Sequence, residues 1–407
     1  MAQGCENGPR RIRRGSGMRV TYINQTGQLG GGELAILPWL QHEAEKAHVI
    51  LFEDGPFRQL LESADVEVEL LSLRSVKNIR RESGLFAVFR ALPGLVNLRS
   101  VLRSRLASSE ILYANSQKAF FLSAMSKRSH QPLIWHLRDI MTGDHFSRFM
   151  RKLAVWMGNR YATHIIANSH ATSDAFVANG GLRRKVTVVH DGVSGNAFAE
   201  TEGEQKFAQL FRREHSIPEE APLVGVFGRL SEWKGQHVLL QAMANLPNAH
   251  AVLVGDAMFG EHAYVEKLRM QATALDVVGR IHFLGFRRDI PELMKAMTVI
   301  VHTSIAAEPF GLVIVEGMLA CRPVIATRAG GALEIIVDGV SGILVTPGNS
   351  GELDMTIREL LTNPERARTL AEAGRERALA TFSVEALFSG IEKVLYDVEK
   401  SQNVGSA

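Results

Sequence analysis

Two carboxylates eight residues apart, Glu308 and Glu316, give this 407-residue sequence its clearest potential for chemistry. The residues between them read PFGLVIV: Pro309 is rigid, Gly311 is conformationally permissive, and an apolar run begins at Leu312. This pattern predicts a loop that enters a short buried helix. A helix N-terminus presents unpaired backbone N–H groups, which suit a phosphate. The two carboxylates could therefore hold sugar hydroxyl groups on either side of bound phosphates.

A second segment, GRLSEWKG from Gly228 to Gly235, combines two cations with the start of a helix. Arg229 and Lys234 lie five residues apart, and Ser231 between them is of a type that caps helices. Cations near a helix N-terminus are unfavourable unless an anion is present. The segment therefore favours a diphosphate site over an ordinary cationic first turn. No Asp-x-Asp motif follows a predicted strand, so we expect neither a metal ion nor a cofactor.

Two further segments follow predicted strands, and each has two interpretations. Gly31 and Gly32, in GQLGGGE, belong either to a flexible surface loop or to a point of close approach to a ligand. Their spacing does not match the Rossmann fingerprint G-x-G-x-x-G. His136, in IWHLRDI, is either a core histidine on an apolar run or a functional group. In the second case Arg138 and Asp139 could orient it or contact phosphate.

These segments together resemble one known family. EPFGLVIVE, followed by Gly330 and Gly331 fourteen residues beyond Glu316, resembles the E-x7-E motif of the retaining family 4 glycosyltransferases. GRLSEWKG resembles the G-R-x-x-x-x-K-G motif of the same family. The resemblance runs from about residue 18 to 398. It implies the GT-B fold, an α/β architecture in which two Rossmann-like domains face a central cleft. It also implies a retaining, metal-independent transfer of a hexose from a nucleotide diphosphate to a hydroxyl acceptor.

The resemblance also implies roles for individual residues. Arg229 and Lys234 would hold the donor diphosphate and stabilise its charge as it leaves, which is electrostatic catalysis without a metal. Glu308 would contact the transferred sugar from the side, Glu316 would bind ribose, and His136 would lie near the sugar. The other donor-binding residues that the resemblance implies are Gly31, Gly32, Gly228, Phe286, Arg287, Phe310, Gly311, Leu312 and Val313.

Two other regions bear on the base and on the domain junction. In the family, the base is held mainly by backbone groups after the strand that matches Arg280–Phe286, which makes Phe286 and Arg287 candidates. The segments IANSHATSDAF and VTVVHDGVSGNAF resemble the junction pattern, but Asp191 stands where the family usually has Asn, so its role is open. Five histidines follow no such pattern and are interpreted as structural: His130, His145, His164, His170 and His302.

Among family 4 members, the chain most resembles bacterial enzymes of exopolysaccharide assembly, particularly in Ile111–Phe120 and Trp135–Arg148. A donor of the UDP-glucose type is expected first and GDP-mannose next, with a glycan or lipid-linked glycan as acceptor. Two alternatives are a catalytically silent GT-B binding subunit and a GT-B nucleotide-sugar epimerase. The first predicts loss of Arg229, Lys234 or Glu308, and all three are present. The second needs a different carboxylate set and no separate acceptor.

The elements that must position these residues alternate between strand-like and helix-like patterns. β-branched apolar runs bounded by turn residues predict parallel sheets covered by helices on both faces. The predicted strands are Met18–Asn24, His48–Glu53, Val66–Leu73, Ile111–Asn115, Leu133–Leu137, His164–Asn168, Val186–Val193, Leu223–Leu230, His250–Asp256, Arg280–Phe286, Val299–Ser304, Pro323–Arg328 and Gly342–Pro347. A polar linker from 195 to 221 separates the two series. The expected parts are a disordered leader (1–17), an N-terminal acceptor domain (18–200), a C-terminal donor domain (201–381) and a helix crossing back (382–400).

Composition favours a cytoplasmic protein. No apolar run reaches about 18 residues, and the N-terminal arginines are followed by no apolar h-region, so we expect neither a spanning helix nor a secretory signal. The chain contains two cysteines, Cys5 and Cys321, which exclude a disulfide framework.

One run of charge is unusual. Between Arg74 and Arg105, eight cations and one acid, Glu82, interleave with apolar residues. This basic amphipathic segment either lies on an anionic leaflet or forms a solvated helix face. The first interpretation places the protein peripherally on the inner face of the plasma membrane. Nucleic acid is not expected as a partner, since no recognition motif accompanies the charge.

Overall fold

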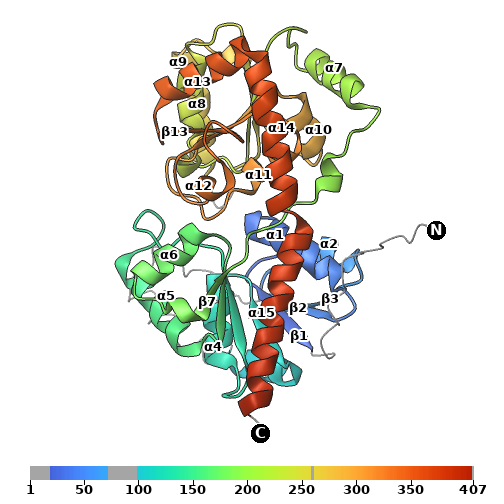
Figure 1. Cartoon of the computed structure of the whole chain (residues 1–407), viewed down its shortest axis with the longest axis vertical. Helices are drawn as coiled ribbons and strands as arrows, with labels where there is room; N and C mark the ends of the chain where they lie inside the picture. The colour runs from blue at the N-terminus through green and yellow to red at the C-terminus, as the bar shows by residue number, and fades with distance from the viewer. Residues whose placement is uncertain (1–18, 72–98, 258–260, 406–407) are drawn as a thin grey trace, which may run out of the picture.

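The structure, a computed structural model, describes residues 19–71, 99–257 and 261–405. Two parallel sheets lie in separate lobes, and the C-terminal helix runs from the second lobe along the first (Figure 1). The predicted α/β class with two Rossmann-like domains is confirmed.

The N-terminal sheet has the strand order β3-β2-β1-β4-β5-β6-β7, and all its neighbouring strands are parallel. Its strands are β1 (Val20–Asn24), β2 (Ala47–Leu51), β3 (Glu67–Leu70), β4 (Ile111–Ala114), β5 (Leu133–Leu137), β6 (His164–Ala167) and β7 (Val186–Val188). The α-helices of this lobe include α1 (Gly31–His42), α2 (Pro56–Glu62), α4 (Gln117–Ser126), α5 (Arg148–Tyr161) and α6 (His170–Ala178).

The C-terminal sheet has the order β10-β9-β8-β11-β12-β13 and is also parallel. Its strands are β8 (Leu223–Phe227), β9 (His250–Val254), β10 (Ile281–Gly285), β11 (Val299–His302), β12 (Val324–Thr327) and β13 (Ile343–Val345). The helices of this half are α7 (Glu204–Glu214), α8 (Gln236–Met243), α9 (His262–Ala274), α10 (Ile290–Ala296), α11 (Leu312–Leu319), α12 (Ala332–Ile335), α13 (Ser350–Thr362) and α14 (Pro364–Thr381).

The central strands are buried on both faces. Every residue of β5, β8 and β9 is buried, as expected for parallel strands covered by helices on either side. Such strands read as unbroken apolar runs, and each of the predicted strand segments overlaps an observed strand. The observed strands end a few residues earlier than several predicted ones, because the last residues of those runs already belong to loops.

The last helix, α15 (Val384–Gly405), packs on the N-terminal half of the chain. Leu387, Ile391 and Val394 belong to a buried cluster that also contains side chains of β1, α1 and β2. Their spacing of three to four residues places them on one stripe of the helix. The ring of Phe388 also meets that of Trp39, with centroids 5.6 Å apart. Contacts of this kind tie the end of the chain to its beginning.

The sheet topology locates the loops that matter. The chain order of the strands reverses between β1 and β4 in one sheet and between β8 and β11 in the other. Ligands of open α/β sheets bind outside the carboxyl ends of strands at such switch points. The segment GRLSEWKG follows β8, and EPFGLVIVE follows β11. Both sequence motifs therefore lie at the switch point of the C-terminal sheet.

Two sequence predictions fall largely outside the described residues. The leader, 1–17, lies outside them entirely, and so do residues 74–98 of the basic segment; residues 99–105 are helical. None of the helices that the structure describes has the length and apolar character needed to cross a membrane.

Candidate functional site

The loop between β11 and α11 is shaped by two glycine turns. Gly311 precedes α11 with φ of 111°, a conformation that favours glycine, so the backbone turns there to start the helix at Leu312. Gly330 has φ of 59°, and a Cβ on it would lie 2.2 Å from the carbonyl oxygen of Glu308. Gly331 donates its N–H to that same oxygen (2.8 Å). The glycine pair beyond the motif thus fixes the backbone of Glu308.

The N-terminus of α11 has the form the sequence predicts. Leu312 and Val313 are its first two residues, so their backbone N–H groups belong to the unpaired set of a helix start. Phe310, by contrast, is 2% exposed and packs in the core, with its ring 5.7 Å from that of Phe382. Its side chain is therefore an anchor for the loop, and any donor contact at this position must come from its backbone.

Glu308 lies at the centre of a compact charged cluster. One carboxylate oxygen forms an ion pair with Lys234; the other accepts hydrogen bonds from His302 and Ser304. The side chains of Glu308 and Lys234 are each 15% exposed. Burial by itself would raise the pKa of Glu308, but the electrostatic effects of Lys234 and His302 and their hydrogen bonds to Glu308 outweigh it, and the pKa lies well below its usual value. Glu308 is therefore ionised at neutral pH.

The loop after β8 brings its cations around one aromatic ring. The Lys234 ammonium lies 4.5 Å from the centroid of the Trp233 ring, and the Arg229 guanidinium lies 5.9 Å from it. Arg229 is also 3.5 Å from a carboxylate oxygen of Glu261. Both predicted cations thus lie in one loop, with Lys234 turned to Glu308.

Two details of this loop differ from the sequence interpretation. Ser231 precedes only a short 3₁₀ turn, Glu232–Lys234, and its side chain makes no capping hydrogen bond. The longer helix, α8, starts at Gln236 after Gly235, which has φ of 69° and lies too close to the carbonyl oxygen of Thr303 for any Cβ. Ser231 as a cap was wrong, because the chain needs a left-handed glycine turn before the helix can begin.

Glu316, in the second turn of α11, is half-buried. Among the residues that the structure describes, none forms a hydrogen bond or ion pair with its carboxylate. Burial raises the pKa of Glu316 to about 7. A carboxylate held without a partner is ready to accept hydroxyl groups from a ligand.

The loop after β10 exposes the two residues proposed for the base. Phe286 is 62% exposed, directly after the strand. Arg287 donates two hydrogen bonds to Asp289, at 2.8 and 2.5 Å, so its guanidinium is already engaged. Gly228, at the end of β8, has φ of 122° and donates its N–H to Val254 in the neighbouring strand.

The N-terminal half contributes a buried polar network. Arg138, just beyond β5, donates to Asp191 (2.5 Å) and to Asn115 (2.6 Å), and it contacts Nδ1 of His136 (3.2 Å). Asn115 in turn donates to the carbonyl oxygen of Gly32 (3.2 Å). Asp191, whose role the sequence left open, thus pairs with Arg138 beneath the glycine loop.

His136 is less accessible than its predicted role implies. It is fully buried, and Nδ1 also meets the Tyr113 hydroxyl at 2.7 Å. Burial, with the nearby Arg138, lowers the pKa of His136 well below its usual value, so the ring is neutral. A direct contact of His136 with the sugar stays a prediction. Gly31 and Gly32 begin α1, and a Cβ on Gly31 would meet nothing within 4 Å.

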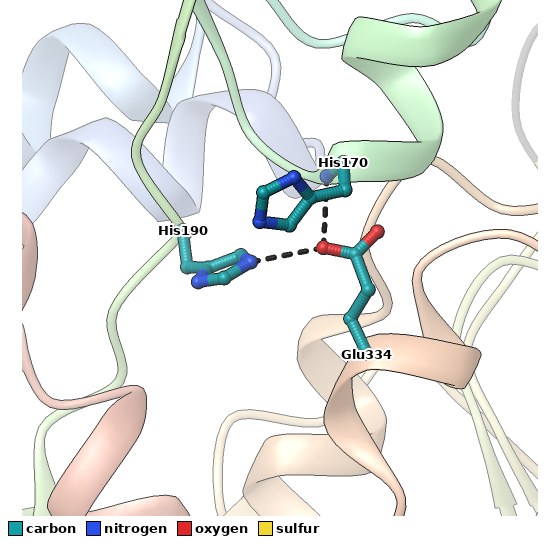
Figure 2. Close-up of side chains that lie close together, drawn as sticks. All are labelled: His170, His190 and Glu334. Atoms are coloured by element: carbon teal, nitrogen blue, oxygen red, sulfur yellow. Dashed lines mark hydrogen bonds and ion pairs between the residues drawn. The ribbon is translucent and has the colours of Figure 1, made fainter.

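Several contacts join the two halves beside these loops. His145 donates from Nε2 to the carbonyl oxygen of Ala307 (2.9 Å), and its ring packs edge-on against Trp233. Glu334 accepts hydrogen bonds from the backbone N–H groups of His170 and Ala171, both 2.8 Å, at the start of α6. Figure 2 shows Glu334 reaching His170 and His190 from the opposite half of the chain.

Glu334 is the acceptor that links these groups. Its Oε2 lies 3.0 Å from Nε2 of His190. Burial would raise the pKa of Glu334, but the hydrogen bonds from His190, Ala171 and His170 lower it overall. Ligand atoms of His170, His190 and Glu334 lie within 4.8 Å of one another, close enough for a metal ion. The carboxylate is already engaged by three donors, so we interpret it as a contact between the halves.

Comparison with known proteins identifies the family. The model of glycosyl transferases group 1 matches residues 207–377, and that of glycosyltransferase family 4 matches residues 47–195. Alr3699/HepE from Anabaena, solved in complex with UDP and glucose, is 36% identical over 93% of this chain and 99% of its own, with a TM-score of 0.83. The chain belongs to glycosyltransferase family 4. Sucrose-phosphate synthase from Thermosynechococcus elongatus, 19% identical over 94% of this chain and 100% of its own, shares the GT-B fold (TM-score 0.75).

Curated members of the family align over shorter stretches. The lipopolysaccharide core biosynthesis glycosyltransferase LpsE from Rhizobium meliloti is 30% identical over 223 residues, 55% of this chain and 61% of its own. The D-inositol 3-phosphate glycosyltransferase of Mycolicibacterium smegmatis is 30% identical over 243 residues, 58% of this chain and 54% of its own. The chain thus spans little more than half the length of these curated relatives.

This family 4 chain has site residues that sequence reasoning missed. His302 was interpreted as structural, yet it bonds directly to Glu308. His170 was given the same interpretation, which fits the contact of its backbone N–H with Glu334 between the halves, but Glu334 itself was not noticed. A usable signal existed for His302, because it ends a buried strand just before the motif. No comparable signal existed for Glu334, which lies 164 residues from its partner.

Proposed function

We propose that the protein is a retaining glycosyltransferase, which moves a sugar from a nucleotide diphosphate to a hydroxyl acceptor. UDP-glucose is the first candidate donor and GDP-mannose the next. The observation that carries the proposal is the meeting of Lys234, Glu308 and the N-terminus of α11 at one switch point of the C-terminal sheet. Alr3699/HepE, which has been solved with UDP-glucose, supports the choice of donor.

Arg229 and Lys234 would stabilise the negative charge that develops on the departing diphosphate. The backbone N–H groups of Leu312 and Val313 would add the positive end of the α11 dipole. Glu316 would accept hydrogen bonds from ribose hydroxyls. With this much positive charge supplied by the chain, the proposed reaction needs no metal ion.

The state of Glu308 bears on how configuration is retained. A retaining hydrolase uses a carboxylate as nucleophile. Here both oxygens of Glu308 are engaged, by Lys234 on one side and by His302 and Ser304 on the other. A same-face displacement fits better: the bond from the anomeric carbon to phosphate breaks, the bond to the acceptor oxygen forms on the same face, and the acceptor proton passes to the departing phosphate.

The acceptor is proposed to be a glycan or a lipid-linked glycan of exopolysaccharide or cell-envelope assembly. Relatives named for lipopolysaccharide core biosynthesis, such as LpsE, support this class. A lipid-linked acceptor would bring the enzyme to the inner face of the plasma membrane. The proposal assigns no role to nucleic acid or to a cofactor.

Thermal-shift screening against UDP, GDP, ADP and their common sugars tests the donor first. A ligand present at about 100 times its Kd adds about 2.7 kcal/mol of stability, which is enough to rank donors. The best donor is then incubated with glycan acceptors, and the anomeric configuration of the product is read by NMR. A product of inverted configuration contradicts retention. An epimerised sugar without transfer supports the epimerase alternative, and no stabilisation by any nucleotide supports a silent subunit.

A further inference from the structure

A cavity far from the donor loops has five cations in its lining. It has a volume of about 810 Å³ and lies where residues 127–129 and 161–163 lead into β5 and β6, at the amino ends of those strands. The donor loops follow carboxyl ends of strands, so the cavity belongs to a different surface. Its cationic lining residues are Arg99, Arg103, Lys127, Arg128 and Arg160.

These cations have no compensating acids among the residues that the structure describes. None of the described lining residues is acidic. Burial lowers the pKa of Lys127, and the neighbouring charges of Arg160 and Lys185 lower it further. Lys185 shows the same effect, from burial and then from Arg184 and Arg160. Like charges are therefore held close together, at an electrostatic cost that an anion would remove.

Helix C-termini account for only part of this cluster. Lys127 follows α4 and Arg160 lies in the last turn of α5, where cations are favourable. Arg99 and Arg103 lie on a separate helical segment, in which the buried Leu102 packs on the N-terminal core. The positions of these two arginines place them together on one side of that segment, one turn apart. The dipoles of α4 and α5 therefore do not explain the presence of Arg99 and Arg103.

Exposed apolar side chains accompany the cations. Trp156 is 57% exposed and precedes Arg160 by one turn of α5, so both lie on one face of the helix. Its ring meets that of Tyr161 edge-on, with centroids 5.8 Å apart. Met125, which lines the cavity, and Val101 are exposed as well. Tryptophan beside cations is typical of surfaces that sit in the interfacial layer of a bilayer.

We propose that this cavity and its rim bind the phosphate headgroups of an anionic membrane, with Trp156 entering the interfacial layer. The inference rests on the proposed function and deepens it, since this surface would hold the enzyme at the membrane that carries a lipid-linked acceptor. It also extends the predicted basic surface to other elements. The described part of the basic segment contributes Arg99 and Arg103, while Lys127, Arg128 and Arg160 come from other elements.

The test is co-sedimentation of the full chain with vesicles of phosphatidylcholine, with and without phosphatidylglycerol, at low and high salt. The wild type is expected to bind only vesicles with the anionic lipid and to release them as salt rises. Each cation near an anionic surface contributes about a fivefold change in partitioning. The variant Arg103→Ser/Arg128→Ser/Arg160→Ser should therefore bind on the order of a hundredfold more weakly.

A matched control removes the same charge elsewhere. Arg269, Arg366 and Arg368 are exposed on helices of the C-terminal half, and their triple Ser variant should bind vesicles as the wild type does. Equal weakening of both variants would show a non-specific charge effect and overturn the proposal. A wild type that does not bind anionic vesicles at low salt would also overturn the proposal. So would release of the protein by inorganic phosphate but not by chloride of equal ionic strength, because that result would indicate a site for free phosphate.

Trp156 supplies a second readout that does not depend on activity. Its emission should shift to the blue on vesicle binding and be quenched by brominated lipid, and Trp156→Phe should remove this response. Quenching that survives the substitution would overturn the placement of Trp156. Donor hydrolysis should be unchanged in all these variants, because none of the residues lies in the donor loops. Loss of vesicle binding with hydrolysis intact therefore separates failure at this surface from failure of the proposed transferase.

Discussion

Replacing Glu316 with Gln should stabilise the protein at alkaline pH while weakening its hold on the donor. The half-buried carboxylate has a pKa of about 7, against about 4.5 in an unfolded chain. The folded protein thus binds this proton more tightly than the unfolded chain does. The resulting stability is fully present below about pH 4.5 and is lost as the pH rises through about 7. Gln imitates the protonated form at every pH and avoids that loss.

The size of the effect follows from the shift of the pKa. A difference of about 2.5 units corresponds to about 3 kcal/mol at pH 8. For a domain of this size, that raises Tm by roughly 6 °C or more. At pH 5 the same change should be worth less than about 1 kcal/mol. The lowered pKa values of Glu308 and Glu334 place their titration below this window, and groups common to both proteins cancel in the difference.

Differential scanning calorimetry of wild type and Glu316→Gln at several pH values from 5 to 8 measures the difference in Tm between the two proteins. Glu376→Gln, an exposed substitution on α14 of the same domain, is the control and should change Tm little at any pH. A Tm gain in Glu316→Gln that does not grow with pH would refute the electrostatic argument. A loss of Tm at pH 8 would show that Glu316 has a stabilising partner in solution.

Donor binding should respond in the opposite direction. Only the ionised carboxylate accepts two ribose hydroxyls well, and its population rises from about a tenth at pH 6 to about nine tenths at pH 8. Calorimetry with a nucleotide sugar, whose phosphates are both esterified and do not titrate in this range, should show Kd falling about tenfold. In Glu316→Gln the Kd should be higher at pH 8 and independent of pH. A pH-independent wild type would refute the assignment to ribose.

The remaining predictions concern the other charged groups of the site. Lys234→Ala and Arg229→Ala should each cut turnover on the order of 10²-fold. Near-normal turnover in Lys234→Ala would contradict the proposed diphosphate site. Glu308→Gln should lower kcat more than it raises KM for the donor, measured beside Glu316→Gln; the reverse pattern would exchange their roles. Activity should survive EDTA, whereas loss that magnesium or manganese restores would show a metal requirement. Glu334→Gln should loosen the contact between the halves, and an unchanged radius of gyration by X-ray scattering would exclude this.

Much of the fold could be predicted from the sequence, because strands that are buried on both faces appear as continuous apolar runs. The strand β5, for example, is buried at all five positions and reads LIWHL. Such runs alternate with helices throughout, so the strand count and the parallel arrangement followed. The loops that carry Arg229 and Glu308 were placed correctly for the same reason, since both begin where a buried run ends.

The histidines show where this kind of reasoning stops. His136 and His302 both lie at or near the end of a buried strand, β5 and β11. The resemblance placed His136 near the sugar, which stays a prediction; in the structure its ring is buried against Tyr113, while His302, interpreted as structural, bonds to Glu308. The alternation of side chains along a strand decides which face each ring occupies.

Long-range pairs were out of reach for a different reason. Arg138 and Asp191 are 53 residues apart, and no local sequence pattern in either segment predicts that the two side chains pair. Glu334 occupies a short helix after a glycine pair, where a carboxylate reads as an ordinary cap. Its actual partners are the N–H groups that begin α6 in the other half. Contacts of this kind become visible only when the two halves are placed together.

The cluster around Glu308 connects these points to the chemistry. Lys234 forms an ion pair with Glu308, so a diphosphate bound as proposed would share the ammonium with that carboxylate. His302 and Ser304 remain on the other oxygen, so Glu308 need not lose its charge when Lys234 turns to phosphate. Under the proposed function, the lysine would already be positioned for the diphosphate, and little reorganisation would be left for the moment at which charge develops. A buried ion pair is weak evidence for stability, but this one supports the proposed catalytic role of Lys234.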